Sequence, residues 1–204
     1  MGRTSDAEQK LMDAVMELIW HGSYGSTTID QICEKAGVKK GSFYYFYDSK
    51  SDLAACALET TWQQEKPGLD AIFSPTVPPL ERLRRFCELG YEKQKELKRK
   101  HGCVLGCPLF KLGSEVCNQE VKLHQQVKEI LSHYHTYIES AIREAHAQGL
   151  IDAPDPAAKA RMLFAYSEGL LTQARIVNDV EVLREMSEGV LGILGAGSVQ
   201  RQAA

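Results

Sequence analysis

Residues 35–53, with the sequence KAGVKKGSFYYFYDSKSDL, carry the side chains whose types and spacing are best suited to a chemical role. Lysines, hydroxyls and aromatic rings crowd into one short segment. Lysine ammonium and hydroxyl groups bind phosphate oxygens, and polar side chains read base edges in the major groove of DNA. We therefore expect a DNA-recognition helix whose outward-facing side chains are those of Lys39, Lys40, Ser42, Tyr44 and Tyr45.

A turn and a second capped helix must position this short helix. Gly37 follows a helical pattern, and a glycine there commonly ends a helix in the left-handed conformation. Gly41 lies inside the short helix, where glycine costs about 1 kcal/mol relative to alanine, and a close approach of its backbone to a phosphate would offset that cost. Ser49 is expected to cap the next helix, and Lys50 is expected to bind phosphate from its exposed first turn.

The aromatic residues of this segment admit a second interpretation. Phe43, Phe46 and Tyr47 can equally be core residues, because aromatic side chains at helical spacing are usually buried. The lysines fit that alternative less well, since they flank the short helix that contains the glycine.

Residues 24–53 resemble the N-terminal signature of TetR-type transcriptional regulators. The matching features are Thr27-Thr28, Ile32, Ala36-Gly37-Val38, Gly41, the aromatic block of residues 43–47, Ser49-Lys50 and Leu53. The resemblance implies a helix-turn-helix head, and it implies that the hydroxyls of Thr27 and Thr28 lie near phosphates. Cys33 and Asp48 depart from the family pattern, and Asp48 places a negative charge near the expected phosphate contacts.

A second candidate for chemistry is Cys107. Pro108 suits the first position of a helix, which makes Cys107 the N-cap residue. The free N–H groups of a helix start, with basic residues nearby in the sequence, favour the reactive thiolate form of a cysteine. Residues 106–109 also resemble a segment of a TetR-type subgroup that includes electrophile- and oxidant-responsive repressors. The alternative is a small buried cysteine that helps to line a pocket.

A ligand pocket is expected in the C-terminal part of the chain. Its candidate lining residues are mostly aromatic, with a few polar groups: Trp62, Phe86, Gln94, Cys107, Phe110, His124, Tyr134 and Phe164. Such a lining suits an apolar or aromatic small molecule, or an electrophile that adds to Cys107. Gln94 and His124 leave alternatives open, because a buried glutamine more often bonds a neighbour and a lone histidine is more often a core residue.

Apolar residues at helical spacing predict an all-α protein. Besides the recognition helix, we expect helices that start at residues 27–28 and at Pro108, and helices over residues 5–21, 50–65, 80–100, 119–149, 157–177 and 180–195. Residues 1–48 would form a three-helix DNA-binding head, and residues 49–204 a helical ligand-binding and dimerisation body. The last two helices are apolar on more than one face, so residues 157–195 are expected to form a homodimer interface.

Composition narrows the class of protein further. The net charge of the 204 residues is −3, but residues 35–50 hold four lysines against one aspartate, a local charge of +3. The chain shows no catalytic or cofactor motif, no spacing typical of metal ligands, and no signal peptide or membrane span. The six cysteines are interpreted as free thiols of a cytoplasmic protein that is not an enzyme.

These observations favour a ligand-responsive transcriptional regulator, expected to be a repressor. It would bind a pseudo-palindromic DNA operator as a dimer and be released by a small-molecule or thiol-reactive inducer. The alternative is a helical-bundle enzyme or protein-binding adaptor in which the helix-turn-helix is only structural. A DNA affinity that falls by several decades between low and moderate salt would separate the regulator from this alternative.

Overall fold

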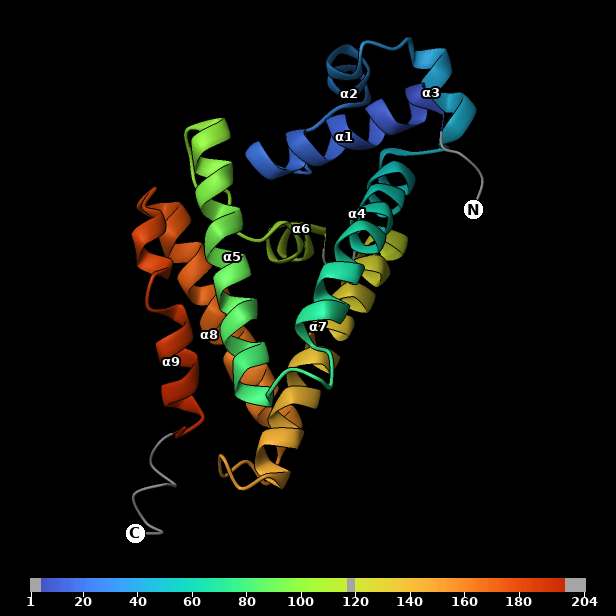
Figure 1. Cartoon of the computed structure of the whole chain (residues 1–204). Helices are drawn as coiled ribbons and strands as arrows, with labels where there is room; N and C mark the ends of the chain where they lie inside the picture. Colours follow the sequence, from blue (N-terminus) through green and yellow to red (C-terminus); the bar gives the residue numbers. More distant parts are fainter. Residues whose placement is uncertain (1–4, 117–119, 197–204) are drawn as a thin grey trace. The chain divides into compact units, whose positions relative to one another are not determined.

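The computed structural model describes residues 5–116 and 120–196, and the regular structure in that part of the chain is entirely helical (Figure 1). The helices are α1 (Asp6–His21), α2 (Ile29–Ala36), α3 (Lys40–Phe46), α4 (Lys50–Ile72), α5 (Pro79–His101), α6 (Pro108–Val116), α7 (Val121–Ala147), α8 (Pro156–Ile176), the short 3-10 helix η1 (Val180–Leu183) and α9 (Met186–Ile193). The all-α prediction is confirmed. No helix among the described residues combines the length and the apolar character needed to cross a membrane.

The chain packs into two compact units. The first consists of Met1–Glu65 with Pro108–Leu131, and the second of Lys66–Cys107 with Ser132–Ala204. Helices α4 and α7 each begin in the first unit and end in the second. The expected division into a head of residues 1–48 and a body of residues 49–204 concerns function, and it stays a prediction.

In the first unit α1, α2 and α3 pack against one another, and α6 packs against α1. Their apolar faces meet in a core whose members with no exposed surface include Leu11, Val15, Ile19, Ile32 and Phe43. Local signals fix the helix ends, and at Gly37 they do so as the sequence indicated. Ser5 and Thr28 form capping boxes at the starts of α1 and α2, and Gly37 ends α2 in the left-handed conformation, with φ at 67°.

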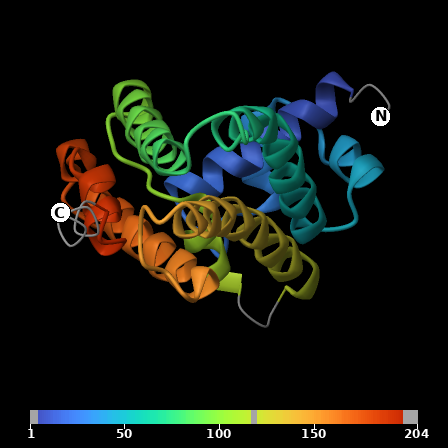
Figure 2. The same ribbon diagram turned by 60° about the horizontal axis from the view of Figure 1, so that its bottom comes forward.

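In the second unit α5 and α8 both pack against η1 and α9. Figure 2 shows the chain leaving α8 (orange) and returning in α9 (red). Val104, Ala174, Val180 and Leu183 form a buried apolar cluster in this unit. Because η1 contributes two of these four residues, the short 3-10 segment is part of the core rather than a surface connection.

The helix end predicted near Pro67 is wrong. α4 continues through Pro67 to Ile72, although a proline removes one backbone N–H and crowds the preceding helical turn. The side chains of Leu69 and Phe73 are only 2% and 8% exposed. Burial of these apolar groups beyond the proline offsets the lost hydrogen bond, and the predicted loop of residues 67–79 is correspondingly shorter.

The helix predicted over residues 180–195 is divided in two. Residues 180–183 form η1, and α9 begins only at Met186. A carboxylate oxygen of Asp179 accepts a hydrogen bond of 3.1 Å from the backbone N–H of Glu181 and so caps η1. Asn178, just before it, has a φ of 51°, which a non-glycine residue adopts only at some cost. This turn separates α8 from η1.

Candidate nucleic-acid interface and effector site

Helix α3 presents most of the residues predicted to contact DNA. Phe43 has no exposed surface, whereas Tyr44 and Tyr45 are 57% and 81% exposed. Aromatic side chains that are this exposed commonly contact a binding partner. The other predicted contacts on and beside this helix are exposed or half-buried: Lys39, Lys40, Gly41 and Ser42. The helix therefore has one anchored face and one open face, as the sequence indicated.

Part of the predicted positive charge is already paired. Lys40 Nζ lies 2.6 Å from a carboxylate oxygen of Asp30, and Lys35 Nζ lies 2.8 Å from one of Glu17. Both pairs are largely exposed, so a phosphate can compete for either lysine. Lys39, at the N-cap of α3, forms no ion pair with the residues that the structure describes. It is the lysine best placed for a phosphate.

The expectation that Lys50 lies in an exposed first turn is wrong. Its ammonium donates hydrogen bonds of 2.7 Å to the backbone carbonyls of Tyr24 and Thr27, and it lies 4.1 Å from the centroid of the Tyr24 ring. Burial lowers the pKa of Lys50. The lysine holds the α1–α2 loop against the start of α4, which is a structural role within the first unit.

The two threonines at the start of α2 differ from each other. Thr28 is exposed, and its hydroxyl oxygen accepts a 3.2 Å hydrogen bond from the backbone N–H of Gln31. Thr27 is 5% exposed, and its hydroxyl donates to the carbonyl of Ser23 at 2.7 Å. The helix predicted to start at residues 27–28 is capped by Thr28 and begins at Ile29, so Thr27 lies outside it. Only Thr28 offers its side chain to a phosphate.

A contact between α6 and the α1–α2 loop was not predicted. Lys111 Nζ donates to the carbonyls of Trp20, at 3.1 Å, and of Gly22. A carboxylate oxygen of Glu115 accepts hydrogen bonds from the backbone N–H groups of Tyr24, at 2.7 Å, and of Gly25, at 3.3 Å. The four-residue spacing of Lys111 and Glu115 was a weak signal, because nothing local shows which backbone a helix face will meet.

In the second unit, three of the predicted ligand-binding aromatics lie in one row. The ring centroids of Phe86 and Tyr134 are 6.1 Å apart, and those of Tyr134 and Phe164 are 6.2 Å apart with the rings inclined by 25°. The residues come from α5, α7 and α8. Phe73 extends the row, with its centroid 5.7 Å from that of Phe86. Such contacts are typical of aromatic packing and make a continuous apolar surface.

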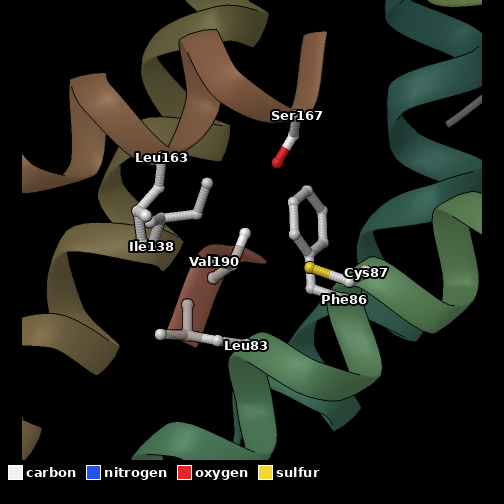
Figure 3. Close-up of a pocket in the computed structure, with 7 residues that line it drawn as sticks. All are labelled: Leu83, Phe86, Cys87, Ile138, Leu163, Ser167 and Val190. Atoms are coloured by element: carbon white, nitrogen blue, oxygen red, sulfur yellow. The ribbon is translucent and has the colours of Figure 1, made fainter. Parts of the chain in front are cut away.

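Phe86 also lines a small pocket with a cavity volume of about 10 Å³ (Figure 3). The other lining residues, which the sequence did not single out as ligand contacts, are Leu83, Cys87, Ile138, Leu163, Ser167 and Val190. The only signal in the sequence was the four-residue spacing of Leu83 and Cys87 within the helix predicted over residues 80–100. Burial raises the pKa of the Cys87 thiol to about 12. The pocket is smaller than the 300–1,000 Å³ typical of drug-sized ligands.

Gln94 satisfies its own polar groups in the second unit. Its amide oxygen accepts hydrogen bonds of 3.2 and 2.9 Å from the N–H groups of Leu105 and Gly106, and its amide nitrogen donates to the Gly106 carbonyl at 3.1 Å. Asn178 holds the same loop, since its amide oxygen accepts a hydrogen bond of 2.9 Å from Val104 N–H. Two carboxamides thus fix the backbone that leads to Cys107.

Cys107 directly precedes α6, as predicted, and is half-buried. It lowers the pKa of the carboxyl group of Glu168, on α8. Glu168 is 6% exposed, and its Oε2 atom has no hydrogen-bond partner among the described residues. Burial raises the pKa of Glu168 from its ordinary value of 4.5 to about 7, and Cys107 opposes this rise.

The raised pKa of Glu168 links its protonation to stability. Between pH 4.5 and about 7 the folded chain keeps a proton on this carboxyl that the unfolded chain has lost. The contribution of Glu168 to stability therefore falls as the pH rises through this window. A lone acid in an apolar helix was the signal for such a group, and sequence reasoning missed it.

The basic residues expected to surround Cys107 are in part engaged elsewhere. Lys98 Nζ donates to the carbonyl of Asn178 at 2.8 Å, and Lys111 Nζ bonds the α1–α2 loop as described above.

The remaining predicted ligand contacts belong to the first unit. Trp62 is 4% exposed, whereas Phe110 is 40% exposed. His124 is half-buried, and its Nδ1 atom is buried without a hydrogen-bond partner among the described residues. A ligand role for these three residues stays a prediction. The five cysteines in the described part of the chain are free thiols, as expected, and Cys117 lies outside it.

A capped helix, a turn at a left-handed glycine and a short helix with exposed tyrosines together define a helix-turn-helix DNA-binding protein. Residues 11–56 match the bacterial regulatory proteins of the tetR family, and residues 79–190 match the tetracyclin repressor-like C-terminal domain. The chain belongs to the TetR family, and it is a ligand-responsive, DNA-binding transcriptional regulator.

Known proteins resemble this chain over most of its length. The transcriptional regulator AcuR of Cereibacter sphaeroides is 29% identical over 172 residues, which cover 83% of this chain and 77% of that protein. The transcriptional repressor NemR of Escherichia coli is 23% identical over 198 residues, which cover 95% and 96%. The crystal structure of the regulatory protein TetR from Rhodobacter sphaeroides has a TM-score of 0.79 at 28% identity and covers 91% of this chain and 97% of that one.

Proposed function

We propose that this regulator is a dimeric repressor that places α3 in the major groove of a pseudo-palindromic operator and is released by a small molecule or a thiol-reactive inducer. The observation that carries the proposal is the contrast within α3, where Phe43 is fully buried and Tyr45 is 81% exposed. A helix anchored on one side and open on the other can enter a groove without unfolding its support. NemR, a relative of this chain, is named a repressor. A protein of this kind would act in the cytoplasm.

The proposed DNA contacts divide by chemistry. Tyr44 and Ser42 would contact base edges, and Lys39, Lys40 and Tyr45 would contact phosphates. Thr28 and the Gly41 backbone would add phosphate contacts, because Thr28 is exposed and nothing lies within 4 Å of a Cβ placed at Gly41. Thr27 and Lys50 support this surface from behind it rather than touching DNA.

We expect Tyr44→Ala and Lys39→Ala to weaken DNA binding in different ways. Loss of a base contact removes about 1–3 kcal/mol of discrimination, so Tyr44→Ala should change the sequences selected from a random DNA pool. Loss of a phosphate contact weakens binding to all DNA sequences alike and reduces the magnitude of the slope of log affinity against log salt by about one. We expect this result for Lys39→Ala. Lys10→Ala, on α1, is the control, since Lys10 is exposed and pairs with Asp6. Failure of the wild-type protein to retain any sequence from the pool would refute the proposal.

An exposed stripe on α8 supports the proposed homodimer. Residues at helical spacing on one face of α8 are all exposed: Met162, Ala165, Gly169, Thr172 and Ile176. Met162 and Ile176 are 53% and 77% exposed, and burial of such groups is the usual basis of a stable self-association. The stripe lies within residues 157–195, where the sequence predicted an interface. A two-fold pairing of this face would match a two-fold operator.

Ile176→Glu should convert the dimer to a monomer without unfolding the chain. A charge placed on the apolar stripe would have to be desolvated in the interface, so we expect the dimer dissociation constant to rise at least about 100-fold. Sedimentation velocity measures the change, and circular dichroism checks the helix content. Val121→Glu is a matched control, because Val121 is also 77% exposed but lies in the first unit. An unchanged dimer in Ile176→Glu would exclude this face as the interface.

The proposed effector site lies in the second unit. Phe86, Tyr134 and Phe164 supply an aromatic row, and Cys107 supplies a thiol. Gln94 holds the loop before Cys107 and would act on the effector through that loop. A small, mostly apolar molecule, or an electrophile that adds to Cys107, suits this lining. To release the operator, the effector must bind the non-binding state more tightly.

A further inference from the structure

An acid of α6 binds the backbone of the loop between α1 and α2. A carboxylate oxygen of Glu115 accepts hydrogen bonds from the N–H groups of Tyr24, at 2.7 Å, and of Gly25, at 3.3 Å. Hydrogen bonds to a charged acceptor are stronger than those between neutral groups. Tyr24 is only 6% exposed, so little water is at hand to replace the carboxylate. The bond to Tyr24 therefore contributes more than an exposed contact would.

The same loop is also held from α4. The Lys50 ammonium donates hydrogen bonds of 2.7 Å to the carbonyls of Tyr24 and Thr27. The N–H group of Thr27 in turn donates to the carbonyls of Ser23 and Tyr24, at 3.2 Å each. Residues 23–27 thus form a hydrogen-bonded turn whose position is set by one side chain of α4 and one of α6.

Helix α6 is a firm support for this turn. Leu112 has no exposed surface. A Cβ placed on Gly113 would lie 3.1 Å from Cγ1 of Val127, so α6 approaches α7 closely. On the other side, Lys111 donates a hydrogen bond of 3.1 Å to the carbonyl of Trp20, near the end of α1. The anchoring of α6 on both sides fixes the place from which Glu115 reaches the turn.

Thr28 directly follows the turn and is the N-cap residue of α2. It is exposed, and its hydroxyl donates to the side-chain oxygen of Gln31 at 3.1 Å. Gln31 is exposed as well, so a phosphate oxygen can take the place of that acceptor. A hydrogen bond weakens steeply when its atoms move apart by about 1 Å. A contact between Thr28 and a phosphate therefore depends on where the turn holds this residue.

We propose that Glu115 is a positioning residue for operator binding, which holds the turn of residues 23–27 so that the Thr28 hydroxyl meets a DNA phosphate. The inference rests on the proposed function, in which Thr28 contacts a phosphate, and it adds a residue of α6 to that contact. Glu115 acts through the loop and not on the DNA, because a carboxylate repels a phosphate.

The test measures the affinity of the full-length protein, by fluorescence anisotropy, for a duplex that the wild type selects from a random DNA pool. We expect Glu115→Ala to weaken binding about tenfold, because the turn loses its tie to α6. Removal of an acid otherwise strengthens the attraction to DNA, so a weaker complex reports the lost hydrogen bonds and not the lost charge. Glu115→Gln keeps an acceptor oxygen and should bind like the wild type.

The matched control is Glu129→Ala. Glu129 is an exposed acid on α7 in the same unit, and its removal changes the net charge by the same amount. We expect the Glu129→Ala variant to bind as tightly as the wild type or up to about twofold more tightly.

Thr28→Ala shows whether Glu115 acts through the proposed contact. Alone, this change should weaken DNA binding about tenfold. In the Thr28→Ala background, Glu115→Ala should cause a further loss of less than about twofold, since the two residues serve one contact. A Glu115 with a merely structural role would give losses that multiply to about a hundredfold, and that result overturns the proposal.

Other outcomes are equally decisive. A Glu115→Gln variant as weak as Glu115→Ala overturns the proposal, because the acceptor oxygen would then be irrelevant. Should circular dichroism show that Glu115→Ala is unfolded, Glu115→Asp takes its place in both backgrounds. Its carboxylate is one methylene shorter and cannot keep both hydrogen bonds, so wild-type affinity of this variant overturns the proposal.

The inference and the proposed function fail in distinguishable ways. If Thr28→Ala binds DNA like the wild type, the phosphate contact of Thr28 in the proposed function is wrong, and the inference falls with it. If Thr28→Ala binds more weakly but Glu115→Ala does not, the contact stands and only the role of Glu115 is refuted.

Discussion

Phe43→Ala should unfold the first unit at a much lower urea concentration than the wild type and abolish binding to the operator. Phe43 has no exposed surface, and its ring lies 5.2 Å from that of Tyr44 and 6.2 Å from that of Tyr47, measured between centroids. Truncation of a fully buried phenylalanine costs about 3–5 kcal/mol. Since α3 has only seven residues and cannot persist alone, it would lose its position when this anchor is removed.

Tyr45→Ala separates the loss of stability from the loss of the DNA contact. Tyr45 is 81% exposed, so its truncation should change the free energy of unfolding by less than about 0.5 kcal/mol while still weakening DNA binding. Urea unfolding followed by circular dichroism, with a mobility-shift assay on the same samples, gives both quantities. If the free energy of unfolding of Phe43→Ala were within about 1 kcal/mol of the wild-type value, the α1–α2 core alone would hold α3 in place.

Arg82→Ala should destabilise the second unit by about 2–3 kcal/mol, somewhat less than a fully buried ion pair would lose. Arg82 is 1% exposed, its Nε donates to the Val77 carbonyl at 2.7 Å, and its Nη1 donates to a carboxylate oxygen of Glu144 at 2.6 Å. The side chain of Glu144 is 36% exposed and can regain water, which reduces the expected loss. Without Arg82, the loop before α5 also loses its tie to α7.

The control for Arg82→Ala lies two residues along the same helix. Arg84 pairs with Glu188, but the two side chains are 43% and 69% exposed, so Arg84→Ala should cost less than about 1 kcal/mol. Arg82→Met tests the cause, because it keeps the buried volume and removes the charge. The Nη2 atom of Arg82 has no hydrogen-bond partner among the described residues, so we expect Met to be better tolerated than Ala. Equal losses for the Arg82→Ala and Arg84→Ala variants would contradict the role of burial.

The parts of the head that were predicted correctly are governed by local chemistry. Gly37 ends a helix because its own backbone can adopt a positive φ, and Ser49 caps α4 because its hydroxyl oxygen accepts the N–H of Asp52, three residues away, at 3.0 Å. Phe43 and Tyr44 are neighbours with opposite exposure, which follows from the helical period once a helix is assumed. Such features need no knowledge of the rest of the fold.

The errors share a different cause. The ammonium of Lys50 donates its hydrogen bonds to the carbonyls of a loop more than twenty residues earlier in the sequence. Helix α4 continues beyond Pro67 because side chains distant in the sequence bury Leu69 and Phe73. The carboxyl of Glu168 has a raised pKa because the fold buries it. In each case the decisive partner comes from another part of the chain, and single-sequence patterns do not specify such pairings.

The hydrogen bonds from Gln94 and Asn178 to the loop before Cys107 also determine when the thiol acquires its surroundings during synthesis. Gln94 and the loop are close in sequence, so the hydrogen bonds of Gln94 can form early. Asn178 follows α8 and leaves the ribosome much later. Until it emerges, the backbone before Cys107 is held from one side only. The position of Cys107 is therefore a property of the completed fold.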